Sequence, residues 1–505
     1  MREQIPVLIV LIPLSAAALA PLFASLSVRL VRLTTIGAIV ASLICSVFAL
    51  IRALSEGPWS YWFGGWEPPW GIEYVIDPLG AGMAVLITFI ALVVAFYTIP
   101  FFHHDTSPLR KGMLLSLFLL IVTGLTGIVL TGDLFNLFVF IEISALATYA
   151  LVATGGPKAA VASFYYVLVG TVGASLYLLG VGYLYAMTGS LNMADLSEIL
   201  PSLENSQAIV TALVLIAIGM ALKMGLFPMH GWLPSVYVYA PPPLTALLSS
   251  VNGKVFTYVL LRLFFFTFGA DYGPVPDILR ALGIAAAVGV IVASVTAIGQ
   301  TDFRRLLAYS GISQVGYIVI GLSTGNAIAL LGSLLHMLNH AFMKCCLFFV
   351  AGGVQWKTGE DVKWKTGIYE VHMYAGINKV MPLSMIALLI SAFSMIGLPP
   401  TAGFFSKMYL TQGAIEAGQW HYAAVIIVGS LLSAVYFFKV IEQVFLKNQD
   451  GDLTEIIKEK KLFWELPATI LIPIVMLGIG IILLGIFNQT IITNILQYAL
   501  PGGVL

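Results

Sequence analysis

The sequence predicts an all-α polytopic membrane protein with about fourteen transmembrane helices. Of its 505 residues, 59% are hydrophobic and 10% are charged, and the mean hydropathy is +0.98. A soluble domain carries about 25% charged residues, so a soluble globular protein is excluded. One span needs about 20 apolar residues. Stretches without Asp, Glu, Lys or Arg lie at 81–100, 112–132, 159–194, 281–301, 306–335, 380–406 and 466–505.

Hydrophobic segments and short polar loops define the expected spans in order. These are 5–27, 33–53, 78–100, 112–131, 134–153, 160–187, 207–227, 242–268, 279–299, 305–322, 327–353, 380–416, 421–446 and 464–487. The seventh and twelfth spans are expected to be broken, at LFPMHGWLP (226–234) and GLPPTAGF (397–404). Breaks at corresponding places in two halves are typical of inverted repeats. Four regions follow: helices 1–3 with an aromatic outer loop (1–110), two inverted five-helix repeats (111–268 and 279–446), and a last helix with an interfacial tail (447–505).

The outer loop at 55–77 is rich in aromatic residues, with four tryptophans and two tyrosines among several Gly and Pro. Such residues gather at the headgroup level of a membrane. We expect an interfacial hairpin or lid without chemistry of its own.

Basic residues are distributed unequally between the two sides of the predicted bundle. The side opposite the N-terminus has fifteen, namely Arg29, Arg32, Arg110, Lys111, Lys158, Arg304, Arg305, Lys357, Lys363, Lys365, Lys379, Lys447, Lys458, Lys460 and Lys461. The other side has four, Arg2, Arg52, Arg262 and Arg280. The positive-inside rule therefore places both termini outside a prokaryotic cytoplasmic membrane. Because Arg29 and Arg32 follow the first apolar run, we expect this run to be a span and not a cleaved secretory signal.

Charge and cysteine content exclude other classes. Twenty-four basic and 24 acidic residues give no net charge, so no nucleic-acid partner is expected. The three cysteines, Cys45, Cys345 and Cys346, form no CxxC motif. Iron–sulfur, zinc and c-type haem sites are therefore unsupported, and we expect no cofactor and no metal.

Seven charged residues inside the predicted spans are candidates for a buried role. They are Glu142, Lys223, Lys254, Arg262, Lys344, Lys407 and Lys439. A charge at the bilayer centre costs about 2.5–3.5 kcal/mol on insertion scales, so these side chains must be paired, hydrated or functional.

Glu142 and Lys223 are the first predicted functional pair. Glu142 lies about 13 Å beyond Asp133, the expected cap of its helix, and Lys223 ends the helix before the first break. If the distance between the two charges alternates, the proton affinity of the lysine alternates with it. The competing interpretation is a structural ion pair. His230, inside the break, either passes protons inward or is a satisfied interfacial histidine.

Lys254 and three residues of the eleventh span extend the prediction. Lys254 follows Ser249, Ser250 and Asn252, whose polar groups would hold water beside it. His336, His340 and Lys344 share one helix face at steps of about 6 Å, which suits a proton path. A zinc site at the two histidines is the competing interpretation, but no further ligand is evident.

Lys407 follows the second break, as an inverted counterpart of Lys223. Lys439 and Arg262 lie close to helix ends, where long basic side chains reach the interface. For these two we expect a structural role, and Lys439 is kept as an accessory candidate.

Four strings carry a resemblance to a known family: KMGLFPMHGWLPSVYVYAPPPLTALLSSVNGKVFTYVLLR (223–262), TDFRRLLAYSGISQVGYI (301–318), LLHMLNHAFMKCCLFFVAGG (334–353) and GLPPTAGFFSK (397–407). Over about residues 70–450 the chain resembles the antiporter-like, proton-translocating subunits of respiratory complex I. It is equally similar to the D-type subunits of Mrp sodium/proton antiporters and to relatives in membrane-bound hydrogenases. The family fold, two inverted five-helix repeats within fourteen helices, agrees with the span count.

The resemblance implies a role for each candidate. Glu142 matches the glutamate of helix 5, Lys223 the lysine of helix 7 and Lys254 the central lysine of helix 8. The relay of helix 11 corresponds to His336, His340 and Lys344. Lys407 matches the terminal lysine of helix 12, where some family members have glutamate.

The expected function is that of an ion-translocating membrane subunit of an Mrp-type cation/proton antiporter, with sodium or a second proton as the coupled ion. The alternative is the homologous subunit of a complex I-type dehydrogenase or membrane-bound hydrogenase. A third possibility is a scaffold whose charges fix helix packing. The expected partners are other hydrophobic subunits and the lipid bilayer. Nothing in the sequence resembles flavin, nickel or quinone machinery, so any redox chemistry would belong to other subunits.

Overall fold

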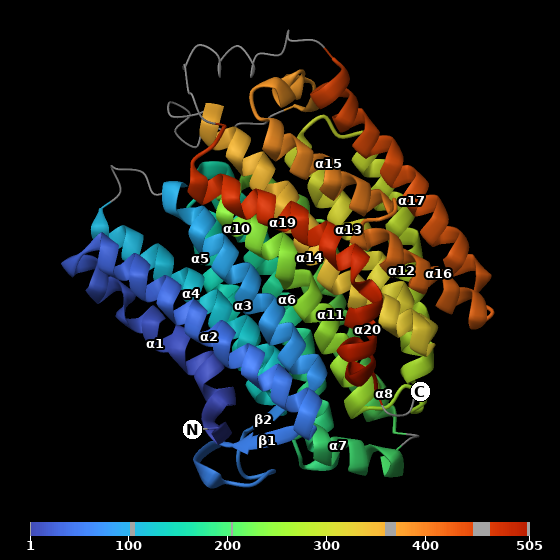
Figure 1. Cartoon of the computed structure of the whole chain (residues 1–505). Helices are drawn as coiled ribbons and strands as arrows, with labels where there is room; N and C mark the ends of the chain where they lie inside the picture. The colour runs from blue at the N-terminus through green and yellow to red at the C-terminus, as the bar shows by residue number, and fades with distance from the viewer. Residues whose placement is uncertain (1, 102–106, 204–205, 359–369, 448–464, 502–505) are drawn as a thin grey trace.

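In the computed structural model the chain is a bundle of long helices (Figure 1). The structure describes residues 2–101, 107–203, 206–358, 370–447 and 465–501. Thirteen helices of this part are long and apolar enough to cross a membrane, which confirms the all-α polytopic class. Five lysines that predict the orientation lie outside the described residues, as does the end of the predicted tail (502–505); the lysines are Lys363, Lys365, Lys458, Lys460 and Lys461.

The first half of the bundle is formed by α1 (Ile5–Leu26), α2 (Val28–Glu56), α3 (Pro78–Thr98), α4 (Pro108–Leu130), α5 (Leu134–Ala153), α6 (Pro157–Thr188), α7 (Met193–Ile199), α8 (Gln207–Met224), α9 (Leu233–Tyr239), α10 (Pro242–Leu247) and α11 (Gly253–Leu261). The second half is formed by α12 (Val275–Ile298), α13 (Phe303–Thr324), α14 (Ala327–Thr358), α15 (Pro382–Ile396), α16 (Ala402–Glu416), α17 (Trp420–Ile441), α19 (Ala468–Ile486) and α20 (Asn488–Asn494). The shorter pair α15–α16 would be a fourteenth span, and that number stays a prediction.

The aromatic loop at 55–77 folds into a hairpin, as predicted. Strands β1 (Trp59–Trp62) and β2 (Glu73–Ile76) pair antiparallel, with Trp59 opposite Ile76. Trp66 and Trp70, in the turn between them, are exposed. Both ends of the chain lie toward the same end of the bundle as this hairpin (Figure 1).

Both predicted helix breaks are confirmed. The seventh span stops at α8 and continues after residues 225–232 as α9, and the twelfth consists of α15 and α16. Gly225 and Gly397 end the first segments with φ of +72° and +95°, a left-handed conformation that favours glycine. Backbone groups freed at such breaks need protein or water partners, because lipid offers none.

The eighth span contains an irregularity that the sequence analysis did not predict. Between α10 and α11 the chain forms a π-helical segment, η5 (Leu248–Asn252), and a second one, η6 (Arg262–Thr267), follows α11. Local π-turns insert extra backbone and occur frequently at functional sites. The segment η5 holds the polar residues that precede Lys254.

The two halves share features in matching order. Asp133 caps α5 and its backbone bridges to Asn192, while Asp302 caps α13 and its backbone bridges to Glu370. Burial raises the pKa of both capping carboxyl groups above the ordinary value for aspartate. Two structural repeats would produce such matching caps and backbone bridges, and also the two broken helices. The boundaries of the four predicted regions stay a prediction.

Arg262 corrects one expectation. It does not extend its side chain to the membrane surface but forms a bidentate ion pair with Asp77, at 2.5 and 2.8 Å, and bonds to the Tyr258 hydroxyl at 3.0 and 3.1 Å. Both charged side chains are 11% exposed. Asp77 also caps α3 by accepting from the Gly80 amide. The pair therefore ties α3 to the end of the eighth span.

Replacing Asp77 by alanine is expected to destabilise the protein by about 3–5 kcal/mol, because Arg262 would keep a buried charge without its partner. The midpoint of thermal unfolding of the purified complex in detergent measures this loss. Asp277→Ala is the matched control, since Asp277 and Arg280 form an exposed pair, and its midpoint should stay at the unmodified value. Equal midpoints for the two variants would show that the Asp77–Arg262 pair does not stabilise the protein.

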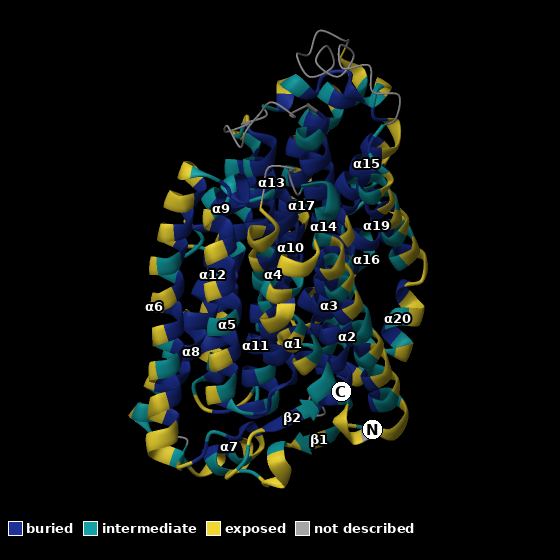
Figure 2. Ribbon diagram, turned by 90° about the vertical axis from the view of Figure 1, so that its left-hand side faces the viewer, coloured by how far each residue is buried: buried dark blue, intermediate teal, exposed yellow. Residues whose placement is uncertain are grey.

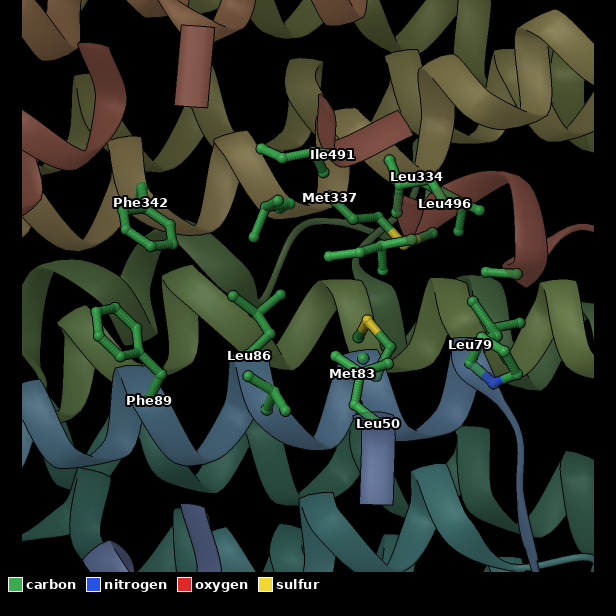
Figure 3. Close-up of a pocket in the computed structure, with 16 residues that line it drawn as sticks. Leu50, Leu79, Met83, Leu86, Phe89, Leu334, Met337, Phe342, Ile491 and Leu496 are labelled. Atoms are coloured by element: carbon green, nitrogen blue, oxygen red, sulfur yellow. The ribbon is translucent and has the colours of Figure 1, made fainter. Parts of the chain in front are cut away.

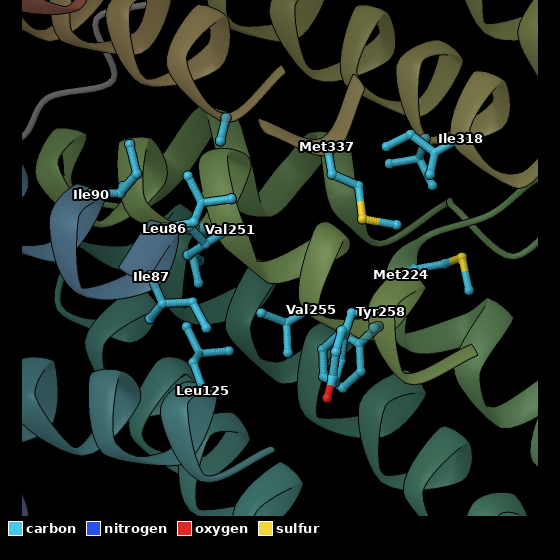
Figure 4. Close-up of a cluster of buried hydrophobic side chains, with 14 of the residues drawn as sticks. Leu86, Ile87, Ile90, Leu125, Met224, Val251, Val255, Tyr258, Ile318 and Met337 are labelled. Carbon is cyan, nitrogen blue, oxygen red and sulfur yellow. The ribbon is translucent and has the colours of Figure 1, made fainter. Parts of the chain in front are cut away.

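Buried residues fill the middle of the bundle and exposed apolar side chains cover its periphery (Figure 2). Figure 4 shows part of the core, where Ile87 of α3, Leu125 of α4, Val255 of α11, Ile318 of α13 and Met337 of α14 converge. Exposed leucines, valines and isoleucines on α6, α12 and α17 face outward, as lipid contact requires.

The C-terminal tail folds back on the chain. The helix α20 and the following 3₁₀ turn η10 (Leu496–Ala499) pack against α3 and α14. They close one side of an apolar cavity of about 320 Å³ whose lining includes Leu79, Met83, Met337 and Leu496 (Figure 3). Phe89 and Phe342 also line it, stacked 5.4 Å apart. The predicted interfacial tail is thus held against the bundle over its described length.

Candidate functional site

Glu142 and Lys223 form an ion pair inside the first half of the bundle. The ammonium of Lys223, at the end of α8, donates to Glu142 Oε1 on α5 at 3.3 Å. The Lys223 side chain is 2% exposed and that of Glu142 is 24% exposed. One partner is therefore enclosed while the other is reachable from outside the protein core, so the pair connects the interior to the surroundings.

The first helix break is anchored beside this pair. Trp232, which directly precedes α9, stacks on Tyr166 of α6 with ring centroids 4.1 Å apart. Its indole N–H donates to the Leu222 carbonyl at 3.3 Å, one residue before Lys223. The broken segment therefore contacts the backbone that carries the lysine.

Lys254 is held by the π-helical segment of its own span. Its ammonium donates to the Ser249 carbonyl at 2.5 Å, and the residue is 1% exposed. In a regular α-helix that carbonyl would bond to a backbone amide four residues later. The π-turn redirects it toward the lysine.

Lys344 lies between α14 and α13. Its ammonium donates to the Leu307 carbonyl and to the Ser310 hydroxyl at 2.7 Å, and it is 1% exposed. Phe348, one turn further along α14, places its ring 5.9 Å from the same ammonium. No carboxylate among the described residues forms an ion pair with Lys254, Lys344 or Lys407.

His336 and His340 stack on one face of α14, with ring centroids 5.9 Å apart and planes 13° from parallel. His336 is hydrogen-bonded on both ring nitrogens, to Ser406 at 2.8 Å and to Gln314 at 3.0 Å. His340 is 1% exposed, and within the described part of the chain neither of its ring nitrogens has a hydrogen-bond partner. The two histidines are therefore fixed to very different degrees.

Lys407 sits against the second helix break. Its ammonium donates to the carbonyls of Met395 and Ile396, at 2.8 and 3.2 Å, and to the Ser430 hydroxyl at 3.1 Å. Those carbonyls are at the end of α15, where the break leaves them without helical partners. The Tyr317 ring lies 4.7 Å from the ammonium.

The two accessory candidates make contacts of their own. His230 is half-buried within the first break and stacks on Phe227 at 5.4 Å. Lys439 is half-buried and donates to the carbonyls of Ile298 and Gln300, at 3.4 and 3.1 Å, which caps the end of α12. Lys439 therefore has a packing partner and does not extend freely to the interface.

The structure brings five of the seven main candidates into one electrostatic group. The charges of Lys254, Lys344 and Lys407 all act on His340, and those of Lys254 and Lys407 act on His336. The pair of Glu142 and Lys223 stands apart, with no hydrogen bond to this group among the described side chains. Within the same part of the chain, no three His, Cys, Asp or Glu residues come close enough to hold a metal ion.

Sequence reasoning missed Arg304. It is counted above as a loop charge, yet it is 8% exposed and donates to the carbonyls of Ala240 at 2.8 Å and Tyr237 at 3.3 Å. The signal was present, because a basic residue at the start of a helix opposes the helix dipole and needs another partner.

The neutral partners of the lysines and histidines were missed too. They include Ser310, Gln314, Tyr317, Ser406 and Ser430. Three of them are on α13, spaced four and three residues apart within an uncharged span. That spacing makes a polar stripe on one helix face and would have revealed them.

Broken helices and buried ionisable side chains thus define a multi-pass membrane protein of the ion-transporting kind. A family model described as "NADH:quinone oxidoreductase/Mrp antiporter, TM" matches residues 131–433, and "NADH-Ubiquinone oxidoreductase (complex I), chain 5 N-terminus" matches residues 62–110. The chain belongs to this family of antiporter-like membrane subunits, which confirms the resemblance seen in its motifs.

Two relatives extend over almost the whole chain. NADH-quinone oxidoreductase subunit N of Desulforudis audaxviator is 50% identical over 99% of both chains. The D-type subunit of the Na⁺/H⁺ antiporter of Alkalihalophilus pseudofirmus is 32% identical over 98% of this chain and 97% of that one.

Two solved structures share the fold. A chain of the membrane-bound sulfane sulfur reductase, an archaeal respiratory membrane complex, has a TM-score of 0.88 at 30% identity, covering 98% of this chain and 97% of that one. A chain of the Mrp complex from Dietzia has a TM-score of 0.87 at 23% identity, covering 99% and 97%. Both are structures of membrane complexes.

Proposed function

We propose that this chain is a proton-translocating subunit of a multisubunit Mrp-type cation/proton antiporter in a prokaryotic cytoplasmic membrane, with both termini outside. The observation that carries the proposal is the series of buried charges. The first half holds the Glu142–Lys223 ion pair and Lys254, the second half holds Lys344 and Lys407, and the last three lysines bind only neutral oxygens. A lysine without a carboxylate partner can hold or release a proton without breaking an ion pair. Such residues inside membranes mark ion paths.

The route begins at Glu142, which is partly exposed, and continues to Lys223 at 3.3 Å. When Lys223 moves away from Glu142, its positive charge loses a compensating partner, and the proton on it is easier to release. Movement of the first break supplies the displacement, since Trp232 contacts the backbone beside Lys223. Lys254 follows, and Lys407 receives the proton at the far end of the second half.

Electrostatic repulsion couples the second half. A proton arriving on Lys254 adds a positive charge that acts on Lys344 and on both histidines. This favours release of a proton further along, toward Lys407. Reciprocal coupling of this kind is a property of any pair of sites whose charges interact.

The second candidate is the homologous subunit of a redox-driven complex, and the relative named NADH-quinone oxidoreductase subunit N favours it. In that case the same route would be driven by electron transfer in other subunits. Proton movement inside this chain would follow the same residues.

The test is purification of the intact complex from native membranes under mild conditions, followed by reconstitution into liposomes. The antiporter predicts small hydrophobic partner subunits and proton movement driven by a sodium gradient. The second candidate predicts partner subunits with iron–sulfur clusters and proton movement that requires an electron donor. Finding both would rule out the antiporter in favour of the redox-driven complex. No proton movement under either condition would refute both.

A further inference from the structure

We infer that Ser406 is a positioning residue for proton transfer at His336. Its hydroxyl turns between the His336 ring and the Gly403 carbonyl, so that the histidine stays fully hydrogen-bonded with one ring proton or with two. This inference rests on the proposed function and identifies the group that allows one histidine of α14 to hold a proton in transit.

The His336 ring is held between two neutral side chains. Its Nδ1 lies 2.8 Å from Ser406 Oγ on α16, and its Nε2 lies 3.0 Å from Gln314 Oε1 on α13. All three residues are fully buried. The two ring nitrogens therefore face two different helices, and each has one oxygen atom as its partner.

Ser406 has a second partner within its own helix. Its Oγ lies 3.2 Å from the carbonyl oxygen of Gly403, in addition to the contact with His336. A hydroxyl donates one hydrogen bond and can accept two, and a carbonyl oxygen has two lone pairs. Gly403 can therefore accept from Ser406 as well as from the backbone amide one turn later.

These contacts satisfy both protonation states of the histidine. With a proton on Nε2 only, His336 donates to Gln314 and its Nδ1 accepts from the Ser406 hydroxyl. With protons on both nitrogens, the ring donates to Gln314 Oε1 and to Ser406 Oγ, and the Ser406 hydroxyl donates to Gly403 instead. A single hydroxyl rotation separates the two states.

His340 has no comparable arrangement. It is 1% exposed, and neither of its ring nitrogens has a hydrogen-bond partner in the part of the chain that the structure describes. A buried charge without hydrogen bonds is costly. Of the two histidines, His336 is therefore the one whose protein surroundings stabilise the charged ring.

The start of α16 is fixed firmly enough to keep this geometry. Asn339 of α14 donates to the Ala402 carbonyl at 2.8 Å, and the Gly403 amide donates to Ser394 Oγ of α15 at 3.0 Å. A Cβ added at Gly403 would overlap the Ser394 carbonyl oxygen, so glycine permits this close approach. The Gly403 carbonyl and Ser406 thus keep their places beside α14 while the hydroxyl turns.

The transfer conserves atoms and charge. The Ser406 hydroxyl first turns to Gly403, which frees the lone pair of His336 Nδ1. A lysine ammonium of the proposed route then gives one proton to Nδ1 by way of water, which leaves a neutral amine and an imidazolium. When the imidazolium passes one proton on to the next neutral amine, the Ser406 hydroxyl turns back to Nδ1.

The test measures proton flux of the intact complex in liposomes with a pH-sensitive dye, over a series of pH values. In Ser406→Ala the imidazolium has no acceptor for its Nδ1–H, so protonation of His336 needs a higher proton concentration. We expect flux to fall by about tenfold at neutral pH, as for loss of one hydrogen bond to a charged group. The flux should recover at a pH roughly one unit lower, because one pH unit is a tenfold change in proton concentration.

Three further variants separate this role from packing. Gln314→Leu removes the acceptor for Nε2–H and should show the same recovery in acid. Ser406→Thr keeps the hydroxyl and should keep the pH dependence of the unmodified complex. Ser391→Ala is the matched control and should leave flux unchanged at every pH, since Ser391 is equally buried and donates to the Ala387 carbonyl within α15.

Other titratable groups around His336 are the same in all these variants. Among the described residues they are Lys407 of α16, Lys254 of α11, His340 of α14 and Tyr317 of α13. Their titration contributes to the pH dependence of every variant. The difference between Ser406→Ala and the unmodified complex therefore reports on His336.

A loss of flux in Ser406→Ala that is equal at every pH would show a packing role and overturn the inference. Unchanged flux in Ser406→Ala at neutral pH would overturn it as well. Failure of the proposed function has a different signature, namely normal flux in Glu142→Gln.

Discussion

Replacing Glu142 by glutamine is expected to stop proton transport while the complex still assembles. The substitution keeps the shape of the side chain but removes the charge that lies 3.3 Å from the Lys223 ammonium. Without that charge, the proton affinity of Lys223 no longer changes as the lysine moves toward or away from residue 142. Proton release by Lys223 depends on this change. We expect transport to fall by at least about a hundredfold, the lower range for groups that transfer protons. Flux in liposomes, measured against the same amount of assembled complex, gives the value.

Glu56→Gln is the matched control, because Glu56 forms an exposed pair with Arg52 and should show unchanged flux. Lys223→Ala should be as defective as Glu142→Gln, and the double variant no worse than either, since the two residues act as a unit. Additive losses in the double variant would show that the residues act separately.

Replacing Lys407 by methionine should also abolish transport, because the final proton acceptor is lost while its volume is kept. The groups around the Lys407 ammonium make replacement by glutamate a second informative test. Lys407 donates to two carbonyls at the end of α15, where the helix dipole is negative. An ionised carboxylate there would face two carbonyl oxygens that cannot donate, and only the Ser430 hydroxyl could give it a hydrogen bond. We therefore expect Lys407→Glu to be at least as defective as Lys407→Met and to reduce the yield of complex as well.

Lys407→Arg is the informative control. It keeps the positive charge and the donors, but it does not release a proton in proteins. It should therefore assemble normally and still fail to transport. Normal transport in Lys407→Arg would mean that the position needs only a positive charge, and the role of terminal proton carrier would be wrong.

The membrane class, the two breaks and the aromatic hairpin could be predicted because each depends on local sequence. Long uncharged stretches can only be buried in lipid or protein, and Pro and Gly within them interrupt a helix wherever the chain goes. The face shared by His336, His340 and Lys344 follows from helix geometry in the same way.

Partners between distant segments could not be predicted. Arg262 is close to a helix end, which suggested the membrane surface, and nothing local reveals that Asp77 lies beside it. The π-helical segment η5 could not be predicted for a similar reason, because Ser249 and Asn252 are equally compatible with a regular α-helix. Its geometry depends on the packing around Lys254.

Arg304 joins the two halves of the bundle by hydrogen bonds, in addition to the interaction between their buried charges. It is on α13 but holds the carbonyls of Ala240 and Tyr237, at the end of the helix that follows the first break. The same α13 supplies the Ser310 oxygen that binds Lys344. A shift of the segment after the first break would therefore also displace the start of α13, so the two halves are coupled through the backbone as well as through charge.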